Sequence, residues 1–561
     1  MINFTELLKQ KEYLKNLHEG ENCFTFYANF ILRNKEEYQI KIEFNEHFPS
    51  YLPEISLTGV DLKNIDHPHI DREGKICFLD IKGLVWSHEP SKCIDFTFEQ
   101  IEKLLSLDQC KLRYEYHKEY DFFILSLYNR ELAFSLGDNL DDLEEINLVT
   151  KKSRPICFAK NDESTKDILS RKLFDDNNLI NANGIFVRLS EPYHADIPRY
   201  NAFWSSKDIV SIVKTYSTEE VKSKLYSLPY SNKQNYYYLV ELTLLTGRQV
   251  LLGLWYRRIT KTDSRTIPLL DSDADNYYKI IPIYIQRMDK TLVDRTGGQL
   301  FNDKVLLIGC GSLGSNILFL LAQAGFTNIT IIDNDKIYPE NACRHFLGVN
   351  YGTKGLEKVK ALKTEIELRY PFTRVRPYND DILKLISDGT VTFEDYDLVI
   401  VAIGNPNIEK MVNRTIIQTN TPSIYSWIEP YGLGGHSLLI SDSNQGCYEC
   451  IFRNGLFNEV SFAAVSDEPY IKNNTGCGGS FTPYGNIDAM QSALVTVRLV
   501  LSYINNKVSG NMLASWKGDC SNFISEGFET SQRYNQLNNA ISMESVNFSR
   551  SDCSGCSKER E

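Results

Sequence analysis

The 561-residue chain lacks three features that would place it in other protein classes. No apolar run reaches ~18 residues, the length that a membrane-spanning helix needs, so we expect no membrane span. The first residues, MINFTELLKQKEYLKN, carry charges throughout and have no apolar centre of the signal-peptide kind, so we expect a cytoplasmic protein. Basic residues are not in excess, because the net charge is −12, and this disfavours broad nucleic-acid binding.

A disulfide framework is not indicated either. The chain has 13 cysteines, an odd number, spread over a large protein without a signal peptide. Cysteines in that setting are better explained as thiols, metal ligands or nucleophiles.

The length predicts about three domains. Residues 1–135 predict an α+β unit, in which a first helix ends near HEGEN and is followed by two or three strands and a closing helix, FTFEQIEKLLSL. Residues 136–290 predict a mixed α/β linker or docking domain, where NYYYLVELTLLTG and RQVLLGLWYRR pair as strands through a turn at Thr246–Gly247. Residues 291–561 alternate short apolar strands with helices, which predicts a doubly wound α/β domain. The last ~40 residues are polar and predict loops.

The segment GCGSLG is typical of a phosphate-binding turn between a strand and a helix. Gly309, Gly311 and Gly314 lie between the apolar run KVLLI and the helical run SNILFLLAQAG. Glycines let the backbone approach phosphates, and a helix N-terminus favours negative charge. The next strand ends at Asp333, 24 residues after Gly309, the spacing of a carboxylate that binds a ribose hydroxyl. An oxidoreductase that binds a nicotinamide dinucleotide would show the same features.

Further polar residues favour a different reaction. Asp335, Asn341 and Arg344 follow closely, and Lys358 begins the next predicted helix. Arginine and lysine near a nucleotide's phosphates can neutralise the charge that builds when the α-phosphorus is attacked. The reaction is then adenylyl transfer, in which a carboxylate attacks ATP and pyrophosphate leaves. Lys354 is an alternative to Lys358, because its loop, YGTKGLEK, is extended.

The segments GCGSLG, IIDND and NACRH, together with the Lys358 helix, resemble the adenylating domain of ubiquitin-activating enzymes, which the bacterial ThiF and MoeB proteins share. The resemblance covers roughly residues 300–505. It implies that Asp333 holds the ribose of ATP and that Asn341, Arg344 and Lys358 contact its phosphates.

The same resemblance implies a homodimer and a magnesium ion. Members of the family usually pair through this domain, and Arg295 is a candidate for an arginine that reaches the partner's ATP. The family often has an acidic residue after the YDLVIVA strand, where it helps to hold Mg²⁺. Here Gly404 stands at that place, so Asp335 or a substrate group is expected to serve the metal instead.

Two C-x-x-C pairs predict a zinc site. Cys447 and Cys450 lie in GCYEC, and Cys553 and Cys556 lie in DCSGC. Four thiolates suit tetrahedral Zn²⁺, and a site with four protein ligands leaves no open position, so the ion would be structural. Many relatives in the family named above carry the same two pairs. Free or redox-active thiols are the alternative.

A further cysteine, Cys477, lies between glycines in NNTGCGGSFTPYGN, just before a predicted helix. A thiolate there could attack an acyl-adenylate and form a thioester. The resemblance implies this role for a cysteine in the crossover loop. Cys520, in KGDCSN, is the second candidate, and a thiol without a role is the remaining alternative.

The front of the chain resembles the ubiquitin-conjugating fold over most of residues 1–125. The resemblance rests on FPSYLPEISL, on HPHIDREGKICFLDI, on Trp86 and on the helix FTFEQIEKLL. The family motif is His-Pro-Asn followed by a cysteine eight residues later. In this chain the motif is HPH, with His69 at the place of the asparagine and Cys77 at that spacing.

This second resemblance implies that Cys77 accepts the acyl group from Cys477 as a second thioester, which a target amine then attacks. The family asparagine stabilises the oxyanion of that step. His69 can donate a hydrogen bond from either nitrogen, so it either keeps this role or only shapes the loop.

An activating domain joined to a conjugating domain resembles the CD-NTase-associated fusion ligases of bacterial CBASS anti-phage systems. That resemblance implies that the acyl donor is the C-terminus of a CD-NTase, a cGAS-like nucleotide cyclase, and that its conjugation to an unknown acceptor protein primes antiviral signalling. The residues themselves support only the cascade of adenylation, two thioesters and an amide. Three alternatives remain: a ThiF-like adenylyltransferase of sulfur-carrier or cofactor biosynthesis, an oxidoreductase, and a non-catalytic cyclase-binding scaffold.

Overall fold

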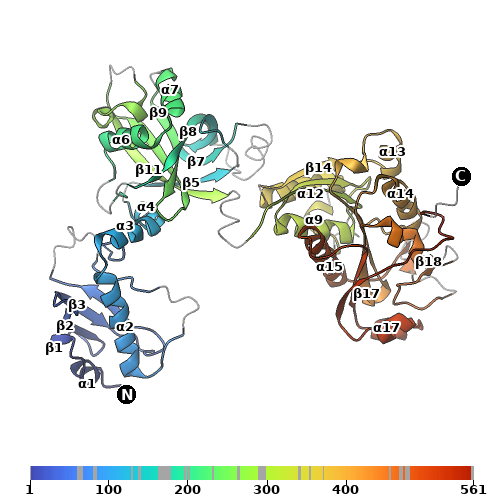
Figure 1. The fold of residues 1–561 in the computed structure, drawn as a ribbon, viewed down its shortest axis with the longest axis horizontal. Coiled ribbons are helices and arrows are strands. Elements are labelled where there is room, and N and C mark those ends of the chain that lie inside the picture. Colours follow the sequence, from blue (N-terminus) through green and yellow to red (C-terminus); the bar gives the residue numbers. More distant parts are fainter. Residues whose placement is uncertain are drawn as a thin grey trace. The chain divides into compact units, whose positions relative to one another are not determined.

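The chain forms two compact units, one made of residues 1–166 and 176–287 and the other of residues 167–175 and 288–561 (Figure 1). The computed structural model describes residues 2–59, 67–71, 73–79, 85–127, 130–136, 140–161, 179–194, 197–198, 203–229, 233–261, 266–288, 298–338, 343–352, 355–370, 372–453, 457–466, 470, 472–473 and 480–556.

The first unit begins with a four-stranded antiparallel sheet of order β1-β2-β3-β4, followed by a long helix, α2. The elements are α1 (Phe4–Lys9), β1 (Leu14–Glu19), β2 (Thr25–Ile31), β3 (Glu37–Glu43), β4 (Glu54–Leu57) and α2 (Pro90–Leu105). Alternate residues of β2, among them Phe26 and Phe30, point into the core, as period-two burial requires. Ile94, Phe98 and Ile101 of α2 cover the same core at helical spacing. The strands and helix predicted from the sequence are therefore present.

The first helix is shorter than the sequence predicts. We expected it to continue to HEGEN, but α1 ends at Lys9 and β1 begins at Leu14. Between them, Lys11 Nζ lies 2.7 Å from Asp95 of α2, and the Tyr13 hydroxyl donates to the same carboxylate over 2.7 Å. These contacts across the domain outweigh the local helix preference of the segment.

The rest of the first unit is a closed barrel of strand order β10-β11-β5-β7-β6-β8-β9. Its strands are β5 (Glu131–Leu136), β6 (Leu143–Lys151), β7 (Arg154–Ala159), β8 (Leu179–Tyr193), β9 (Asn235–Leu244), β10 (Gln249–Arg258) and β11 (Tyr278–Met288). The predicted pairing of β9 with β10 is confirmed, and Gly247 donates to Leu244 O in the turn between them. We predicted a mixed α/β domain but not that its strands would close into a barrel.

Helices cover one side of this barrel. They are α3 (Gln109–Lys118), α4 (Tyr120–Ser126), α6 (Ser206–Tyr216), α7 (Glu219–Ser227) and the short turns η2 (Pro268–Leu270) and η3 (Ala274–Asn276). Phe123 of α4 and Ile209 of α6 share a core cluster with Tyr238 of β9, whereas its neighbours Tyr237 and Leu239 belong to a second cluster made of strand residues. The barrel wall therefore separates an inner core from an outer core.

The second unit is built on an eight-stranded sheet of order β14-β13-β12-β15-β16-β17-β22-β23. The first five strands in this order are parallel, and the last three are antiparallel to their neighbours. The strands are β12 (Phe301–Ile308), β13 (Phe326–Ile332), β14 (Arg374–Tyr378), β15 (Leu398–Val401), β16 (Ser423–Ile428), β17 (Gly434–Ile440), β22 (Met512–Lys517) and β23 (Ile541–Ser545). Strand order reverses at β12, so a crevice is expected at its carboxyl end.

Helices cover both faces of this sheet, as a doubly wound domain requires (Figure 1). Val305 and Leu307 of β12 face the core that α9, α12 and α15 cover, and Leu306 and Ile308 face the core that α13 and α14 cover. The helices are α9 (Ser312–Ala324), α11 (Val349–Gly352), α12 (Lys358–Arg369), α13 (Ile382–Ser387), α14 (Pro406–Thr419), α15 (Asn486–Ile504), α16 (Ser521–Ser525) and α17 (Gln532–Gln536). Short strands and turns complete the unit: η4 (Phe393–Asp395), η5 (Pro430–Gly432), η6 (Ser443–Gln445), η7 (Tyr448–Ile451), β18 (Phe452–Arg453), β19 (Phe457–Asn458), β20 (Lys472–Asn473) and β21 (Ser480–Phe481).

By length and composition, α15 could cross a membrane, and among the described residues it alone passes that test. Core helices of water-soluble domains pass the same test, and Ala493, Leu499 and Val500 of α15 are buried in the cluster that contains α9. The finding is therefore weak evidence for a span.

The end of the chain is more ordered than we predicted. Instead of loops, α17 and β23 follow α16, and β23 pairs antiparallel with β22 at the edge of the sheet. Because every other residue of β23 is exposed, its sequence has no strong apolar signal.

Candidate functional site

The glycine turn lies at the carboxyl end of β12 and opens α9. Gly309 has φ +91°, and a Cβ there would lie 2.5 Å from Ala402 O, so only glycine fits. A Cβ on Gly314 would lie 1.9 Å from Gly309 O, which keeps the helix close to the strand. Gly311 has no atom within 4 Å of its Cβ position. The middle glycine therefore leaves backbone accessible to a ligand, as nucleotide-binding turns of this type require.

Asp333 follows β13 and fastens this turn. Its Oδ2 accepts from the Cys310 N–H over 2.7 Å, and its Oδ1 accepts from the Asp335 N–H over 2.8 Å. The side chain remains 11% exposed. Asp333 therefore lies against the glycine turn, and both of its oxygens are held in place, while its binding of ribose stays a prediction.

Lys358 is the first residue of α12, as predicted, and its ammonium lies beside Asp333. The Nζ atom is 2.9 Å from Asp335 Oδ2 and 3.9 Å from Asp333 Oδ1. Its side chain is only 7% exposed, whereas that of Asp335 is 68% exposed. A mostly buried cation is thus aimed at the end of the sheet where the glycine turn opens.

Arg344 stands on the other side of the turn. Its guanidinium lies over the rings of Tyr484, at 4.8 Å, and Phe481, at 5.4 Å. It also donates to Thr482 O over 3.4 Å, and its own carbonyl accepts from the Ser312 hydroxyl over 2.9 Å. This arginine therefore links the glycine turn to the segment that precedes α15.

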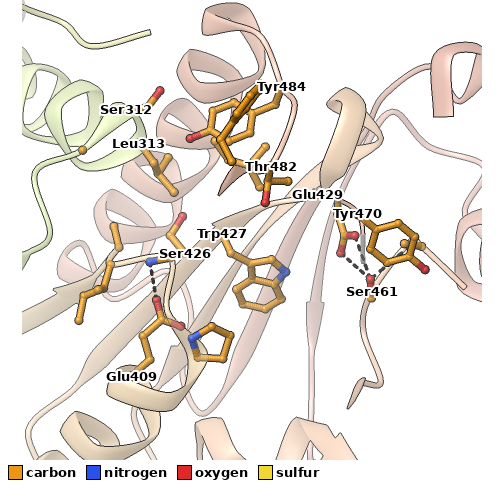
Figure 2. A pocket seen from close by; sticks show the side chains of 18 of the residues that line it. Ser312, Leu313, Glu409, Ser426, Trp427, Glu429, Ser461, Tyr470, Thr482 and Tyr484 are labelled. Atoms are coloured by element: carbon orange, nitrogen blue, oxygen red, sulfur yellow. Dashed lines mark hydrogen bonds between the residues drawn. The ribbon is translucent and has the colours of Figure 1, made fainter. Parts of the chain in front are cut away.

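A pocket of about 600 Å³ opens beside the turn, at the carboxyl ends of β15 and β16 (Figure 2). Trp427 lies in the middle of the view, with Thr482 and Tyr484 above it and Glu409 below it. Its lining also includes Gly311, Ser312, Arg344, Gly404, Glu429 and Ser461. The pocket has room for more than a nucleotide base, and its walls are aromatic and polar.

Gly404, where the resembled family has an acidic residue, lies in this lining with φ +75°. Its N–H donates to Glu409 Oε1 over 2.9 Å (Figure 2). The Tyr448 hydroxyl donates to Oε2 over 2.6 Å. Glu409 is 3% exposed. Burial raises the pKa of Glu409, although these hydrogen bonds oppose the shift. A carboxylate is therefore present next to Gly404, but it is committed to protein donors.

Glu429 marks the far wall of the pocket. Its carboxylate accepts from the Ser461 hydroxyl, from the Phe462 N–H and, over 3.1 Å, from His436 Nε2. The second nitrogen of His436 lies 2.8 Å from the Ser515 hydroxyl. Burial raises the pKa of Glu429, but the hydrogen bonds from His436 and Ser461 outweigh it and hold the pKa below its ordinary value. This buried network holds Glu429, at the pocket wall, in its ionised form.

The four predicted zinc ligands come together although 106 residues separate the two pairs. The Sγ–Sγ distances are 3.8 Å between Cys447 and Cys553 and 3.4 Å between Cys450 and Cys556, and all four sulfurs lie within 4.8 Å of one another. Metal–sulfur bonds of about 2.3 Å in a tetrahedron place sulfurs about 3.8 Å apart. The cluster therefore has the ligand number and spacing that zinc requires.

Neighbouring polar groups support this cluster. Asn413 Nδ2 donates to Cys447 Sγ over 3.4 Å, and the Gly555 N–H donates to Cys553 Sγ over 3.4 Å. Arg414 forms two hydrogen bonds of 2.9 Å with Glu449, which also accepts from Ser554. Such outer contacts orient metal ligands in many proteins.

In the first unit, Cys77 and His69 are cross-strand neighbours. Ile70 and Ile76 form an antiparallel bridge, and the Cys77 N–H donates to His69 O over 2.8 Å. The two isoleucines are buried, so the residues next to them face the opposite side. Cys77 is exposed there.

Four predicted residues, Arg295, Asn341, Lys354 and Cys477, lie outside the described residues, so their roles stay predictions. Cys520, the alternative to Cys477, is half-buried in a small apolar cluster with Phe523 and Tyr534.

Sequence reasoning missed Glu409, Trp427 and Glu429 at the pocket. A usable signal existed for the last two, because YSWIEP ends a parallel strand and ligands bind outside such strand ends. Glu409 gave no signal in the sequence, because it lies within the helix α14. Its contact with Gly404 depends on how the chain turns between β15 and α14.

Comparisons with known proteins find similarity over the second unit. Residues 287–524 match the sequence profile of the ThiF family. The ATP-dependent ubiquitin transferase-like protein Cap2 of Pseudomonas aeruginosa is 25% identical over 247 residues, which cover 42% of this chain and 44% of that protein. Cap2 of Vibrio cholerae is 26% identical over 232 residues, covering 38% of this chain and 37% of that protein. The NEDD8-activating enzyme E1 catalytic subunit of Schizosaccharomyces pombe is 30% identical over 154 residues, covering 27% and 34%. The chain thus spans less than half the length of each of these relatives.

Proposed function

Because residues 287–524 form a ThiF-like activating domain, we propose that the chain is an E1-like enzyme that adenylates the C-terminus of a protein with ATP and passes it through two thioesters to an amine. One observation carries the first step: Asp333 and the buried ammonium of Lys358 lie together at an open glycine turn, beside a pocket of about 600 Å³.

The charges at this turn support adenylation. Asp333 accepts the ribose hydroxyls of ATP, and the backbone at Gly311 approaches the phosphates. Lys358 and Arg344 stabilise the charge that builds as the donor carboxylate attacks the α-phosphorus and pyrophosphate leaves. The aromatic pocket around Trp427 takes the last residues of the donor, whose carboxylate must reach the α-phosphorus.

The implied metals fit the residues that are present. Asp335 is the exposed carboxylate at the turn and would hold Mg²⁺, which takes most of its other ligands from water and phosphate oxygens and supplies charge neutralisation. The four cysteines would hold Zn²⁺, which would link the pair Cys447 and Cys450 to the pair Cys553 and Cys556 near the end of the chain.

The later steps use two cysteines. Cys477 attacks the adenylate and releases AMP, giving the first thioester, and Cys77 then takes the acyl group by thiol exchange. A target amine attacks this second thioester. The likeness to Cap2 supports testing a CD-NTase, a cGAS-like cyclase, as the donor, and anti-phage priming as the outcome.

The enzyme is proposed to act as a homodimer through the activating domain. Ile487, Met490 and Leu494 are exposed on α15 at helical spacing, which supports an apolar contact on this face. Light scattering should give twice the mass of the chain, and Leu494→Lys should lower it.

The cascade is tested with the full chain, ATP and a purified CD-NTase. Cys477→Ala should still exchange labelled pyrophosphate into ATP when donor is present, but form no thioester. Cys77→Ala should keep the first thioester and lose the conjugates, while Cys23→Ala, another exposed cysteine, should behave as the wild type. Normal conjugation by both test variants would refute the cascade. Binding of NAD without ATP turnover would favour an oxidoreductase.

A further inference from the structure

His69, at the place where the resembled family has asparagine, is held by a carboxylate from the next part of the chain. Its Nε2 lies 3.0 Å from Glu115 Oε2 on α3, and the two side chains are 12% and 21% exposed. Sequence reasoning gave no sign of this pair, because 46 residues separate its members.

Its neighbour His67 is arranged differently. His67 Nδ1 accepts from the His69 N–H over 3.4 Å, and Nε2 lies 3.3 Å from Leu104 O, at the end of α2. Both nitrogens of His67 therefore contact backbone, which suits a residue that shapes the loop. In His69, by contrast, one nitrogen contacts a charged side chain, and Nδ1 has no hydrogen-bond partner among the described residues.

This contact fixes the tautomer of His69. A carboxylate only accepts hydrogen bonds when ionised, so Nε2 must carry the proton that lies between it and Glu115. Burial raises the pKa of Glu115, but hydrogen bonds from His69 and Lys118 outweigh it and hold the pKa below its ordinary value, so the group is ionised at neutral pH. In the neutral imidazole, the lone pair is then on Nδ1.

The backbone places this imidazole beside Cys77. The Cys77 N–H donates to His69 O over 2.8 Å, and the bridge between Ile70 and Ile76 puts both side chains on the face away from the core. Side chains of such cross-strand neighbours have Cβ atoms about 4.5–5.5 Å apart. An acyl group on Cys77 and an amine attacking it are thus within reach of His69.

We propose that Glu115 positions His69 as the general base that receives the proton of the attacking amine. The inference rests on the proposed thioester at Cys77, and it gives His69 a role that the family asparagine, which has no basic atom, cannot perform. In this step the amine nitrogen bonds to the thioester carbonyl carbon and its proton passes to Nδ1. The C–S bond breaks, its electron pair leaves with the Cys77 sulfur, and the proton on His69 then passes to that thiolate.

The charged groups around this imidazole make its contact with Glu115 testable by rate. Glu115 and Lys118 face it from α3, and His67 lies beside it with a ring-centroid distance of 6.3 Å. Glu115→Gln removes the charged acceptor that holds the proton on Nε2, so discharge of the Cys77 thioester should slow about 10-fold.

The discharge experiment uses the full chain. The donor is first loaded on Cys77 with ATP, the ATP is then removed, and free lysine is added as the amine. His69→Asn should slow discharge at least as much as Glu115→Gln does, and Glu115→Gln should have no further effect in that background. Glu99→Gln, an exposed carboxylate on α2, is the matched control. Equal discharge rates for the wild type and Glu115→Gln would overturn the proposal.

A second measurement does not depend on ligase activity. The chain has nine histidines, so selective ¹⁵N labelling of histidine, with His69 assigned from its loss in His69→Asn, reports which ring nitrogen carries the proton. We expect protonated Nε2 and unprotonated Nδ1 at pH about 8, and a loss of this preference in Glu115→Gln. The reverse tautomer in the wild type would also overturn the proposal. If no Cys77 thioester forms, the cascade itself is wrong, and the labelled ring still decides whether Glu115 sets the tautomer.

Discussion

The carboxylate of Glu409 accepts the backbone N–H of Gly404 over 2.9 Å, at the point where the family resemblance leads us to expect an acidic side chain. The chain thus keeps a carboxylate at this edge of the pocket but attaches it to another element, α14. Glu409 also accepts from the Tyr448 hydroxyl through its second oxygen. It therefore connects the loop after β15, which contains Gly404, to Tyr448 and so stabilises that loop.

The stability of the second unit should depend on the ionisation of Glu409. Its pKa is raised in the folded state, so its stabilising contribution is present below the ordinary value of 4.5 and is lost as pH rises through the folded pKa. Glu409→Gln does not ionise. We therefore expect the melting temperature of the wild type to fall relative to that of the variant as the pH rises above about 4.5. Glu394→Gln, an exposed carboxylate, should show no such trend, and a constant gap for Glu409→Gln would contradict the argument.

Asp333→Ala should weaken ATP binding by roughly 10- to 100-fold, because hydrogen bonds to a charged group contribute about 1.5–3 kcal/mol. The variant also releases the Cys310 N–H that shapes the turn. Titration with a fluorescent ATP analogue measures the change, and Asp303→Asn, on β12, serves as the control. Unchanged affinity would remove Asp333 from the site.

Arg344→Lys tests whether charge alone is sufficient beside the phosphates. Lysine keeps the charge but loses the flat stacking on Tyr484 and Phe481, which contributes about 1–2 kcal/mol in such contacts. We expect pyrophosphate exchange to fall roughly 5- to 30-fold, the same energy expressed as a rate. If Arg344→Lys matches the wild type while Arg344→Gln is inactive, the stacking has no catalytic importance.

Removal of zinc should lower the stability of the second unit. Elemental analysis should find about one zinc ion per chain in the wild type and little in Cys450→Ser, whose melting temperature should fall by several degrees, at about 2–4 °C per kcal/mol for a unit of this size. Cys23→Ser, an exposed cysteine outside the cluster, should change neither quantity. A metal-free wild type that melts as well as the loaded protein would contradict a structural role.

The sheet of the second unit could be predicted because its signals are local. The runs that became β12, β13 and β15 are short and apolar, and Val359, Leu362 and Ile366 repeat at helical spacing in α12. The glycine turn, Asp333 and Lys358 could be placed because their spacing along the chain follows from one strand, one turn and one helix.

The features that were missed depend on contacts between distant segments. No periodicity in the sequence shows that β5 pairs with β7 to close the barrel, or that Lys11 binds Asp95 and ends the first helix early. The pair formed by Glu115 and His69 is of the same kind. Edge strand β23 was missed for another reason, since it buries little and needs few apolar residues.

The cysteine cluster should hold the second unit together after a protease has cut the chain. Cys447 and Cys553 enclose a segment that contains α15 and the exposed turn around Asn506, which leads into β22. A protease that cleaves this turn would leave fragments joined by the ladder of β17 with β22 and, if the cysteines bind the proposed zinc, by the metal as well. The nicked protein should elute as one species in native buffer and separate only when denaturant and a chelator are both present.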